Sequence, residues 1–420
     1  MSSVVHSKIA NIAASLGLEM QLDLDFDSII KNLNDLDLKA DCTLFCGDNI
    51  DVLASLYESQ QNNVDFCYID PPYNTTNSFI YNDTRVSQQS GLFGSHSSWM
   101  SFMLPRLVWA RELLKDTGII TVSIDDYEQP YLRILLDTIF GEDNFIGNIA
   151  VCRSVNGKGS KKNIAVNHEY VLVYGKSSKS KILGMADDTS KYDKEDEYGR
   201  YKVDGLFRKK GDASRREDRP NMFYPLYYND EGKVFTENTT GNLKEVYPLD
   251  SKGIERRWLW GKDKAKNEAW KLYASPNGVI YVKNYSTAEK RTKIRSLWSD
   301  NRYLTERATK QIKDIYGDKV FETPKPIELI EDLLFSHTSD SSLILDFFAG
   351  TGTTAHAAHN LNCIDGGKRK VILVEKDESI APSHIAAKMG FNLISDITEK
   401  RLKHISNIDT NYKFSVHTIL

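Results

Sequence analysis

The feature that most constrains the fold is an apolar segment, residues 342–346, that runs directly into a glycine turn and then a helix. Gly350 and Gly352 permit a tight turn and let a ligand approach the backbone where side chains would block it. The next apolar strand ends at Glu375, 23 residues after Gly352, where a carboxylate can accept hydrogen bonds from both hydroxyls of a ribose. Strand, turn, helix and acid together predict half of a binding site for a nucleoside-containing cofactor.

The order of segments along the chain narrows the choice of fold. The glycine turn also fits a dinucleotide, so an NAD-dependent dehydrogenase is a competing interpretation. Only 65 residues follow Ala355, too few for a complete doubly wound nucleotide domain. Further buried strands are expected at 64–69, 119–124 and 168–174, before a long polar stretch. The pattern therefore predicts a circularly permuted α/β domain with a largely parallel sheet, and it argues against the dehydrogenase.

Four segments follow from these patterns. Residues 1–40 are acidic and weakly helical, with the best short helix at 28–33, and are interpreted as an accessory segment. Residues 41–176 and 301–420 carry the two halves of the α/β domain. Residues 177–300 are polar, rich in Lys, Tyr and Asn, and contain turn signals, so a separate mixed or β-rich insertion is expected there.

Composition excludes several classes of protein. The 420 residues are 40% hydrophobic and 27% charged, unlike collagen, a disordered chain or a small disulfide scaffold. No run of about 18 apolar residues is present, so no membrane span is expected, and the N-terminus lacks a secretory pattern. Five cysteines without a C-x-x-C pair are expected to be reduced, buried thiols of a cytoplasmic protein: Cys42, Cys46, Cys67, Cys152 and Cys363.

Charge is unevenly distributed, although the net charge is only −4. Residues 1–60 hold ten acidic and three basic residues. The balance is reversed in residues 151–180, with six basic residues and one acidic residue, and in residues 251–310, with fifteen basic and six acidic residues. A basic middle fits a face that binds a polyanion, and a solvated surface is the alternative. No metal site is predicted, because the histidine pair His356 and His359 is expected to lie on a helix surface.

A second motif, Asp70-Pro-Pro-Tyr73-Asn74, follows the strand at 64–69. Asp70 stands at the carboxyl end of a strand, where ligands collect in open α/β sheets. The prolines stiffen the turn and leave carbonyls as its main polar groups. A carboxylate and a carbonyl aimed together accept two N–H bonds from an exocyclic amino group, and Tyr73 offers a face on which a heterocycle stacks. A Pro-Pro turn with an incidental aromatic is the alternative, and it leaves the combination of Tyr73 and Asn74 unexplained.

The two motifs together resemble the paired signature of the amino-methyltransferases that modify exocyclic amines in DNA. D-P-P-Y precedes the insertion and F-A-G-T-G follows it, which is the order of the β-class. Flanking segments are similar to the modification subunits of type III restriction systems: 69–75, 79–83, Trp99, 105–107, 118–126 and 323–326. The resemblance covers residues 43–176 and 297–376. It implies a Rossmann-like, S-adenosylmethionine-dependent methyltransferase fold with an inserted target-recognition domain.

The resemblance also implies a role for each matched residue. Asp70 and the carbonyl of Pro71 would hold the target amino group in a turn completed by Pro72, and Tyr73 would stack on the base. Glu375 would bind the ribose of the cofactor, while Thr323 and Pro324 would begin a helix whose N-terminus meets the carboxylate of the methionine end. The implied cofactor-binding residues are Asp346, Phe348, Gly350, Gly352, Glu375, Thr323, Lys325 and Asp48.

The implied reaction is methyl transfer from S-adenosylmethionine to the N6 amino group of adenine at a specific site in duplex DNA. In-line attack needs alignment and charge stabilisation but no cysteine nucleophile, and the target base must leave the duplex stack. Cytosine-N4 methylation, in which Ser more often replaces the acid at position 70, is one alternative. A silent DNA-binding relative and an RNA or protein amine as substrate are the others. A restriction subunit and a second copy of the chain are expected partners.

The insertion is expected to read the DNA sequence. The glycine-lysine loop after Arg153 would grip phosphates near the flipped nucleotide, and basic clusters in the insertion would add further contacts. The implied DNA-binding residues are Arg153, Lys158, Lys161, Lys162, Arg208, Lys209, Lys210, Arg215 and Arg216. For any one of these side chains in the insertion, a solvated surface is the alternative.

Overall fold

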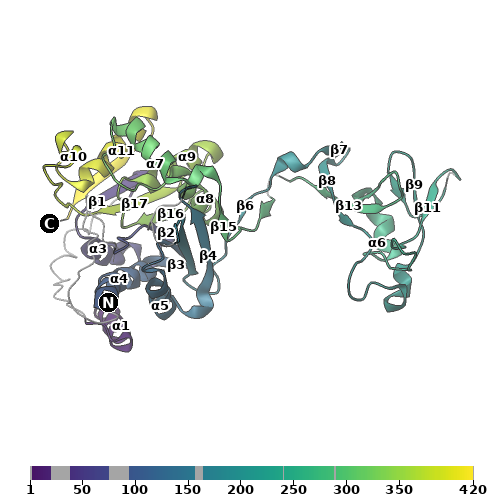
Figure 1. Cartoon of the computed structure of the whole chain (residues 1–420), viewed down its shortest axis with the longest axis horizontal. Coiled ribbons are helices and arrows are strands. Elements are labelled where there is room, and N and C mark those ends of the chain that lie inside the picture. The colour runs from purple at the N-terminus through teal and green to yellow at the C-terminus, as the bar shows by residue number, and fades with distance from the viewer. Residues whose placement is uncertain are drawn as a thin grey trace. The chain divides into compact units, whose positions relative to one another are not determined.

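The computed structural model describes residues 2–19, 38–74, 94–156, 164–239, 241–287 and 290–419, in two compact units (Figure 1). The first unit joins residues 1–185 to residues 293–420, and the second unit is residues 186–292. The second unit is shorter than the insertion expected at residues 177–300. Part of the difference arises because residues 297–298, near the end of the expected insertion, form an edge strand of the main sheet in the first unit.

A nine-stranded sheet lies at the centre of the first unit. Two strands from after the insertion, β16 and β17, lie between β2 and β1 from before it, so the permuted order is confirmed. All pairs are parallel except those that β5 makes with β3 and β4. In sheet order the strands are β15 (Leu297–Trp298), β4 (Phe145–Cys152), β5 (His168–Gly175), β3 (Leu114–Ile124), β2 (Val64–Ile69), β16 (Leu343–Asp346), β17 (Lys370–Glu375), β1 (Cys42–Cys46) and β18 (Phe414–Thr418).

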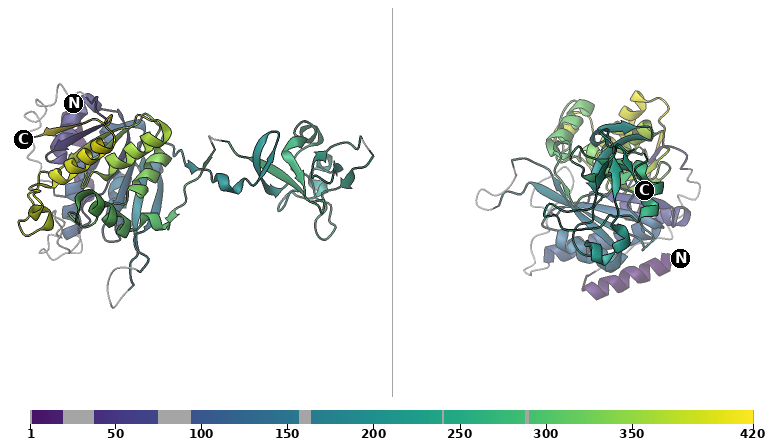
Figure 2. Two further views of the ribbon diagram at one scale, coloured as in Figure 1. Left: turned by 90° about the horizontal axis from the view of Figure 1, so that it is seen from above. Right: turned by 90° about the vertical axis from the view of Figure 1, so that its right-hand side faces the viewer.

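Helices cover both faces of this sheet (Figures 1 and 2). Consecutive strand residues point to opposite faces, so Ile344 enters one hydrophobic core and Leu345 the other. The core that contains Leu345 also holds residues of α1 (Ser2–Leu16), α3 (Asn49–Gln60), α4 (Gly94–Leu113) and α5 (Gln129–Phe140). The core that contains Ile344 holds residues of α8 (Ile327–His337), α9 (Thr353–Asp365) and α11 (Ile394–Ile408). A smaller cluster packs α7 (Thr305–Tyr316) and α10 (Ile385–Lys388) against the start of α11.

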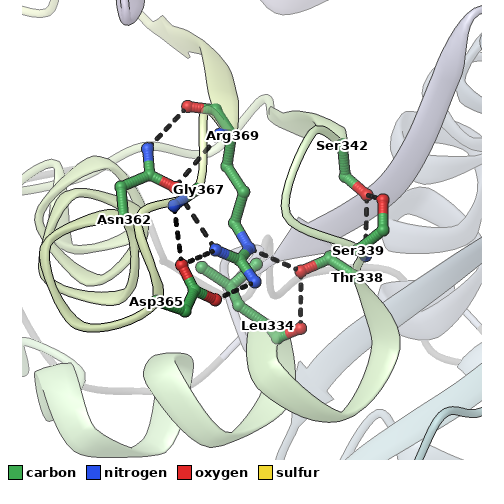
Figure 3. Close-up of polar contacts among 8 residues, drawn as sticks. All are labelled: Leu334, Thr338, Ser339, Ser342, Asn362, Asp365, Gly367 and Arg369. Carbon is green, nitrogen blue, oxygen red and sulfur yellow. Dashed lines mark hydrogen bonds and ion pairs between the residues drawn. The ribbon is translucent and has the colours of Figure 1, made fainter.

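A buried polar cluster ties two of these helices together at the amino ends of β16 and β17 (Figure 3). The Arg369 guanidinium pairs with the Asp365 carboxylate at 2.8 Å and donates from Nε to Thr338 Oγ1 at 3.1 Å. Thr338 in turn donates to the carbonyl of Leu334 at 2.6 Å. Arg369 is only 3% exposed, so this ion pair and its hydrogen bonds fix the ends of α8 and α9.

The second unit is built from short strands. An antiparallel sheet contains β12 (Leu272–Ala274), β13 (Ile280–Tyr285), β8 (Gly199–Leu206) and β7 (Lys194–Asp196). A three-stranded sheet contains β10 (Val234–Phe235), β9 (Leu226–Tyr228) and β11 (Lys244–Val246), and Ala265 of helix α6 (Lys262–Asn267) belongs to the same hydrophobic cluster as Leu226 and Val234. Strands β6 (Met185–Ala186) and β14 (Arg291–Thr292) pair where the chain enters and leaves the unit. Trp258 is 2% exposed and stacks on Phe207, so it belongs to the hydrophobic core of this unit.

The accessory segment differs from its expected structure. Its helix, α1, spans Ser2–Leu16 and buries Val5, Ile9 and Ala13 against the core of the first unit, whereas the sequence indicated only weak helicity over residues 1–40 and placed the best short helix elsewhere. The helix expected at 28–33 lies outside the described residues.

Candidate active site

The two motifs meet at the carboxyl edge of the sheet. Strand β2 ends at Ile69, just before Asp70, and pairs in parallel with β16, which ends at Asp346, just before the glycine turn. Parallel neighbours bring their carboxyl ends to the same edge, where ligands bind in this class of sheet. A cavity of about 360 Å³ opens there and is lined by residues of both motifs, including Asp70, Pro72, Phe348, Gly350 and Glu375. This volume is in the range of small-molecule sites.

The glycine turn adopts the backbone that its sequence predicts. Gly350 and Gly352 have φ angles of 53° and 74°, a region that L side chains rarely adopt. Asp346 supports the turn by accepting from Phe348 N at 3.1 Å and from the Thr354 hydroxyl at 2.6 Å. Burial raises the pKa of Asp346 to about 7, although both hydrogen bonds oppose the shift.

Glu375 closes the same turn from the next strand. Gly350 N donates to its Oε2 at 2.5 Å. Burial raises the pKa of Glu375 to about 8, with the Gly350 hydrogen bond acting against burial and the charge of Asp346 acting with it. Glu375 lines the cavity as a hydrogen-bond acceptor, the property that a ribose site requires.

Asp48 is fixed by a buried arginine that the sequence did not single out. The Asp48 carboxylate caps α3 by accepting from Ile50 N at 3.1 Å, and Arg106 Nη2 donates to it at 2.9 Å. Arg106 also binds Asn49 Oδ1 at 2.5 Å and the carbonyl of Phe102 at 2.7 Å. Its place in the segment 105–107 was a signal of resemblance, but nothing local indicated that it reaches Asp48.

Trp99 on α4 and Glu128, the N-cap of α5, hold the turn that carries Asp70. Trp99 Nε1 donates to the carbonyl of Pro72 at 2.7 Å, so this carbonyl is already engaged. Asn74 Nδ2 donates to the buried Glu128 carboxylate at 2.7 Å, and Asn74 itself has a φ of 54°. Asn74 and Pro72 line the cavity, whereas Pro71 is buried beside it.

Tyr73 contacts the acid of its own motif. Its hydroxyl donates to Asp70 Oδ1 at 2.8 Å and to Glu169 Oε2 at 3.3 Å. Lys325 Nζ lies 2.9 Å from the same hydroxyl and 5.0 Å from the centre of the ring. Tyr73 is not among the residues that line the cavity in the described part of the chain, so base stacking on its ring stays a prediction.

Lys325 brings the second half of the domain onto Asp70. Its Nζ lies 2.8 Å from Asp70 Oδ1 and 3.5 Å from Glu169 Oε2, and Lys325 and Thr323 both line the cavity. The expected helix start at Thr323 and Pro324 is wrong, because α8 begins at Ile327 with Pro326 as its N-cap. A proline disfavours helical backbone in the residue before it, so Pro324 and Pro326 keep their predecessors extended.

Glu169 completes a charge cluster that sequence reasoning missed. It is 2% exposed on β5, and Arg153 Nη1 lies 3.3 Å from its Oε2. Burial opposes ionisation of Glu169, but Lys325 and Arg153 outweigh burial and hold the pKa of this carboxyl below its usual value. The pKa of Asp70 is raised, chiefly by burial and further by the charge of Glu169, while Lys325 and Tyr73 act against both. The carboxyl edge of the sheet therefore holds a charge cluster of two carboxylates, Asp70 and Glu169, and two cations, Lys325 and Arg153.

A family model described as DNA methylase, for N6 and N4 methyltransferases, matches residues 64–388, which include both motifs. The chain belongs to the DNA methylase family. This confirms the resemblance expected from the motifs, methyl transfer to DNA as the activity and S-adenosylmethionine as the methyl donor.

Curated relatives of the methylase include enzymes of two restriction-modification types. The Type II methyltransferase M.KpnI of Klebsiella pneumoniae is 55% identical over 409 residues, which are 97% of each chain. The EcoPI Mod subunit of Escherichia phage P1 is 36% identical over 86% of the methylase and 62% of its own length. The StyLTI Mod subunit of Salmonella typhimurium is 32% identical over 91% of the methylase and 59% of its own length. The methylase therefore matches M.KpnI along its length but spans about three fifths of these type III subunits.

None of the five cysteines of the methylase is among the described residues that line the cavity. All five are free thiols; Cys42, Cys46 and Cys67 are buried, Cys152 is half-buried, and Cys363 is exposed, unlike the burial expected for it. Burial raises the pKa of Cys46 to about 12, so this thiol is a poor nucleophile. No helix in the described part of the chain is long and apolar enough to cross a membrane.

The residues expected to bind DNA fall into four groups. Lys158, Lys161 and Lys162 lie outside the described residues, and Arg153 contacts Glu169. In the second unit, Lys210 and Arg215 are exposed, and Arg216 is exposed but pairs with Glu255 at 2.9 Å. Arg208 and Lys209 are half-buried.

Proposed function

We propose that this methylase transfers a methyl group to the N6 amino group of adenine at one specific sequence in duplex DNA, as the modification enzyme of a restriction-modification system. The observation that carries the proposal is Asp70, an acid fixed at the carboxyl end of β2 on the edge of the cofactor-sized cavity. Relatives of both restriction types support the biological setting.

The cavity suits the methyl donor. The glycine turn leaves backbone space between Phe348 and Glu375, and Glu375 would accept from the ribose hydroxyls. Asp48, which Arg106 fixes, also lines the cavity, and it would accept a hydrogen bond from an adenine amino group. When bound, S-adenosylmethionine supplies a methyl group on a positively charged sulfur, which is already activated for transfer.

Asp70 would act on the target amine. The nitrogen lone pair of an exocyclic amine is delocalised into its ring, so attack requires a pyramidal nitrogen that develops positive charge. A carboxylate oxygen of Asp70 and the Pro71 carbonyl would accept the two N–H bonds and stabilise that charge. On transfer, the new N–C bond would replace the bond between the methyl group and the donor's sulfur, and Asp70 or water would accept the extra proton from nitrogen.

The target base must leave the duplex to reach Asp70, which costs a few kcal/mol of stacking. We assign sequence reading to residues 186–292, the unit that carries the exposed Lys210 and Arg215. We infer base flipping because Asp70 lines a cavity, and a base that is stacked inside the DNA duplex cannot reach it. A restriction subunit or separate endonuclease, a second copy of the chain, and a cytoplasmic location complete the proposal.

The test is to express the chain in a host that lacks DNA methylation and to identify the modified base in its genomic DNA. N6-methyladenine in one short sequence motif supports the proposal. N4-methylcytosine would instead assign the sister reaction, and unmodified DNA together with cofactor binding would assign a silent DNA-binding protein. Methyl transfer to RNA but not to duplex DNA would overturn the choice of substrate.

A further inference from the structure

Glu169 is a buried carboxylate for which the reaction so far has no use. It lies on β5, next to β3 in the sheet, and is not among the described residues that line the cavity. Burying a carboxylate is unfavourable unless partners compensate its charge. Its partners are Arg153 at 3.3 Å, Lys325 at 3.5 Å and the Tyr73 hydroxyl at 3.3 Å.

Two of these partners also contact Asp70, and both do so at the same oxygen. The Tyr73 hydroxyl and Lys325 Nζ each lie 2.8 Å from Asp70 Oδ1. For Tyr73 and Lys325 alike, the contact with the Asp70 carboxylate is made at Oδ1. The arrangement therefore occupies one oxygen of the acid and leaves the other for a substrate.

We infer that Glu169 is a positioning residue for methyl transfer: it draws Lys325 and Tyr73 toward β5 and thereby confines both to Oδ1 of Asp70. This inference rests on the proposed role of Asp70 as acceptor for the target amine. Without the negative charge of Glu169, Lys325 has one carboxylate partner instead of two. An ammonium group then moves to bridge both oxygens of Asp70 and competes with the amine for Oδ2.

The charge of Glu169 also affects when Asp70 ionises. Glu169 raises the pKa of Asp70, and Lys325 lowers it. Replacing Glu169 by Gln therefore lowers the pKa of Asp70, and replacing Lys325 by Met raises it. The charged and titratable groups whose fields reach Asp70 come from several elements: Tyr68, Tyr73, Arg153, Glu169, Lys325 and Asp346.

The experiment compares full-length wild type, Glu169→Gln and Lys325→Met in single-turnover methyl transfer to target DNA across an acidic to neutral pH series. Rates are normalised to S-adenosylmethionine binding sites. For Glu169→Gln we expect a rate lower by roughly tenfold or more and a cofactor affinity within about twofold of wild type. The acid limb of its pH–rate profile, where the rate falls as Asp70 is protonated, should move to lower pH. In Lys325→Met the acid limb moves to higher pH.

The matched control is Glu112→Gln, which removes a partly buried Glu–Lys pair with Lys8 at 2.6 Å, remote from the cavity. A purely structural role for Glu169 lowers thermal stability in both glutamine variants and leaves the normalised rate and the acid limb unchanged, and that result overturns the inference. If Glu169→Gln fails to fold, the test is the pH–rate profile of Lys325→Met. An acid limb at the same pH as in wild type also overturns the inference. Inactive wild type, or an active Asp70→Asn variant, would contradict the proposed function itself.

Three side chains of different types, a histidine, a cysteine and an aspartate, lie close together outside the cavity. His359 and Cys363 lie one turn apart on α9, and Asp409 follows α11; their ligand atoms lie within 4.8 Å of one another. Cys363 Sγ is 3.6 Å from His359 Nε2. Ligand bonds of about 2.3 Å to sulfur and 2.0 Å to nitrogen at a tetrahedral angle give a separation of about 3.5 Å.

We propose that His359, Cys363 and Asp409 form a binding site for a divalent transition metal of the zinc type, with water as the fourth ligand. This differs from the sequence-based prediction of no metal site, which considered His359 only with His356 on the same helix, whereas Asp409 follows α11 far along the chain. A bound ion joins α9, which follows the glycine turn, to the connection between α11 and the edge strand β18. The site therefore links cofactor-binding and C-terminal elements, and it takes no part in methyl transfer.

Cobalt(II) titration of the metal-free, reduced full-length protein tests this site. The expected result is one bound ion with a thiolate-to-cobalt absorption band, displaced by zinc, and a higher melting temperature with metal. Cys363→Ser abolishes the band, whereas the control Cys152→Ser, at a half-buried cysteine, retains it. Absence of the band in wild type, or its survival in Cys363→Ser, overturns the proposal.

Discussion

Lys325 Nζ lies 2.8 Å from Oδ1 of Asp70, so a lysine from the second half of the domain holds the acid of the first half. Sequence resemblance assigned Lys325 to the methionine end of the cofactor. The residue does line the cofactor cavity, and its ammonium group also sets the charge and orientation of the acid. Cofactor and target amine thus meet at a single side chain, which suits a reaction whose main demand is alignment.

Cofactor affinity should depend on pH through Glu375. The pKa of this carboxyl is about 8 without cofactor, whereas ribose hydroxyls donate to its ionised form. Binding below pH 8 must therefore release a proton, and affinity should increase as pH rises until Glu375 is ionised. Calorimetry in buffers of different ionisation enthalpy measures the released proton. Glu375→Gln should lose the pH dependence, and proton uptake by wild type would contradict the assignment.

Trp99→Phe should slow methyl transfer more than it weakens cofactor binding. The substitution keeps an aromatic ring at the wall of the cavity and removes the hydrogen bond to the Pro72 carbonyl. We expect a rate lower by roughly tenfold, because the turn that carries Asp70 loses its anchor, and a free energy of unfolding lower by about 1 kcal/mol. Single-turnover kinetics and denaturant unfolding measure the two effects. A wild-type rate would show that the turn needs no such anchor.

Arg369→Met should affect stability without affecting chemistry, because Arg369 lies at the amino ends of the strands. Breaking its buried contacts should lower the free energy of unfolding by about 2–3 kcal/mol, near the lower limit for buried pairs because Asp365 is 31% exposed. The control Lys403→Met breaks an exposed pair of the same spacing and should cost less than about 0.5 kcal/mol. Equal losses in the two variants would argue against the buried cluster as a stabilising element.

The second unit is expected to bind DNA largely through phosphates. Lys210 and Arg215 are exposed, and a double substitution to Gln should weaken binding to all sequences. The slope of log affinity against log salt concentration should decrease by about 2 if each side chain contacts one phosphate. Fluorescence anisotropy over a salt series measures the slope, with Lys403→Gln on α11 as the control. An unchanged slope would remove these two residues from the DNA interface.

The sequence predicted the parts of the fold that depend on local pattern. Apolar runs identified β2, β16 and β17 within one residue of their ends, because a buried parallel strand is a short apolar segment bounded by turn residues. The strand-turn order also placed Asp70 and Gly350 at the same edge of the sheet, since parallel strands bring their carboxyl ends together. Strand β4 gave no clear signal, because its side chains are mostly half-buried.

The sequence could not predict contacts that join distant segments. Glu169 and Arg106 look like surface charges until the fold brings Lys325 and Asp48 to them. The hydroxyl of Tyr73 is engaged by the same cluster, so its ring could not be placed from the motif alone. Each of these contacts depends on tertiary packing, which local propensity does not encode.

The central claim is that Asp70 accepts the target amine, and Asp70→Asn tests it most directly. The substitution keeps the size of the side chain and removes the negative charge that stabilises the developing charge on nitrogen. We predict a single-turnover rate lower by about 10²–10³-fold, with S-adenosylmethionine affinity within about twofold of wild type. A variant that binds cofactor and DNA and still methylates at the wild-type rate would contradict the account.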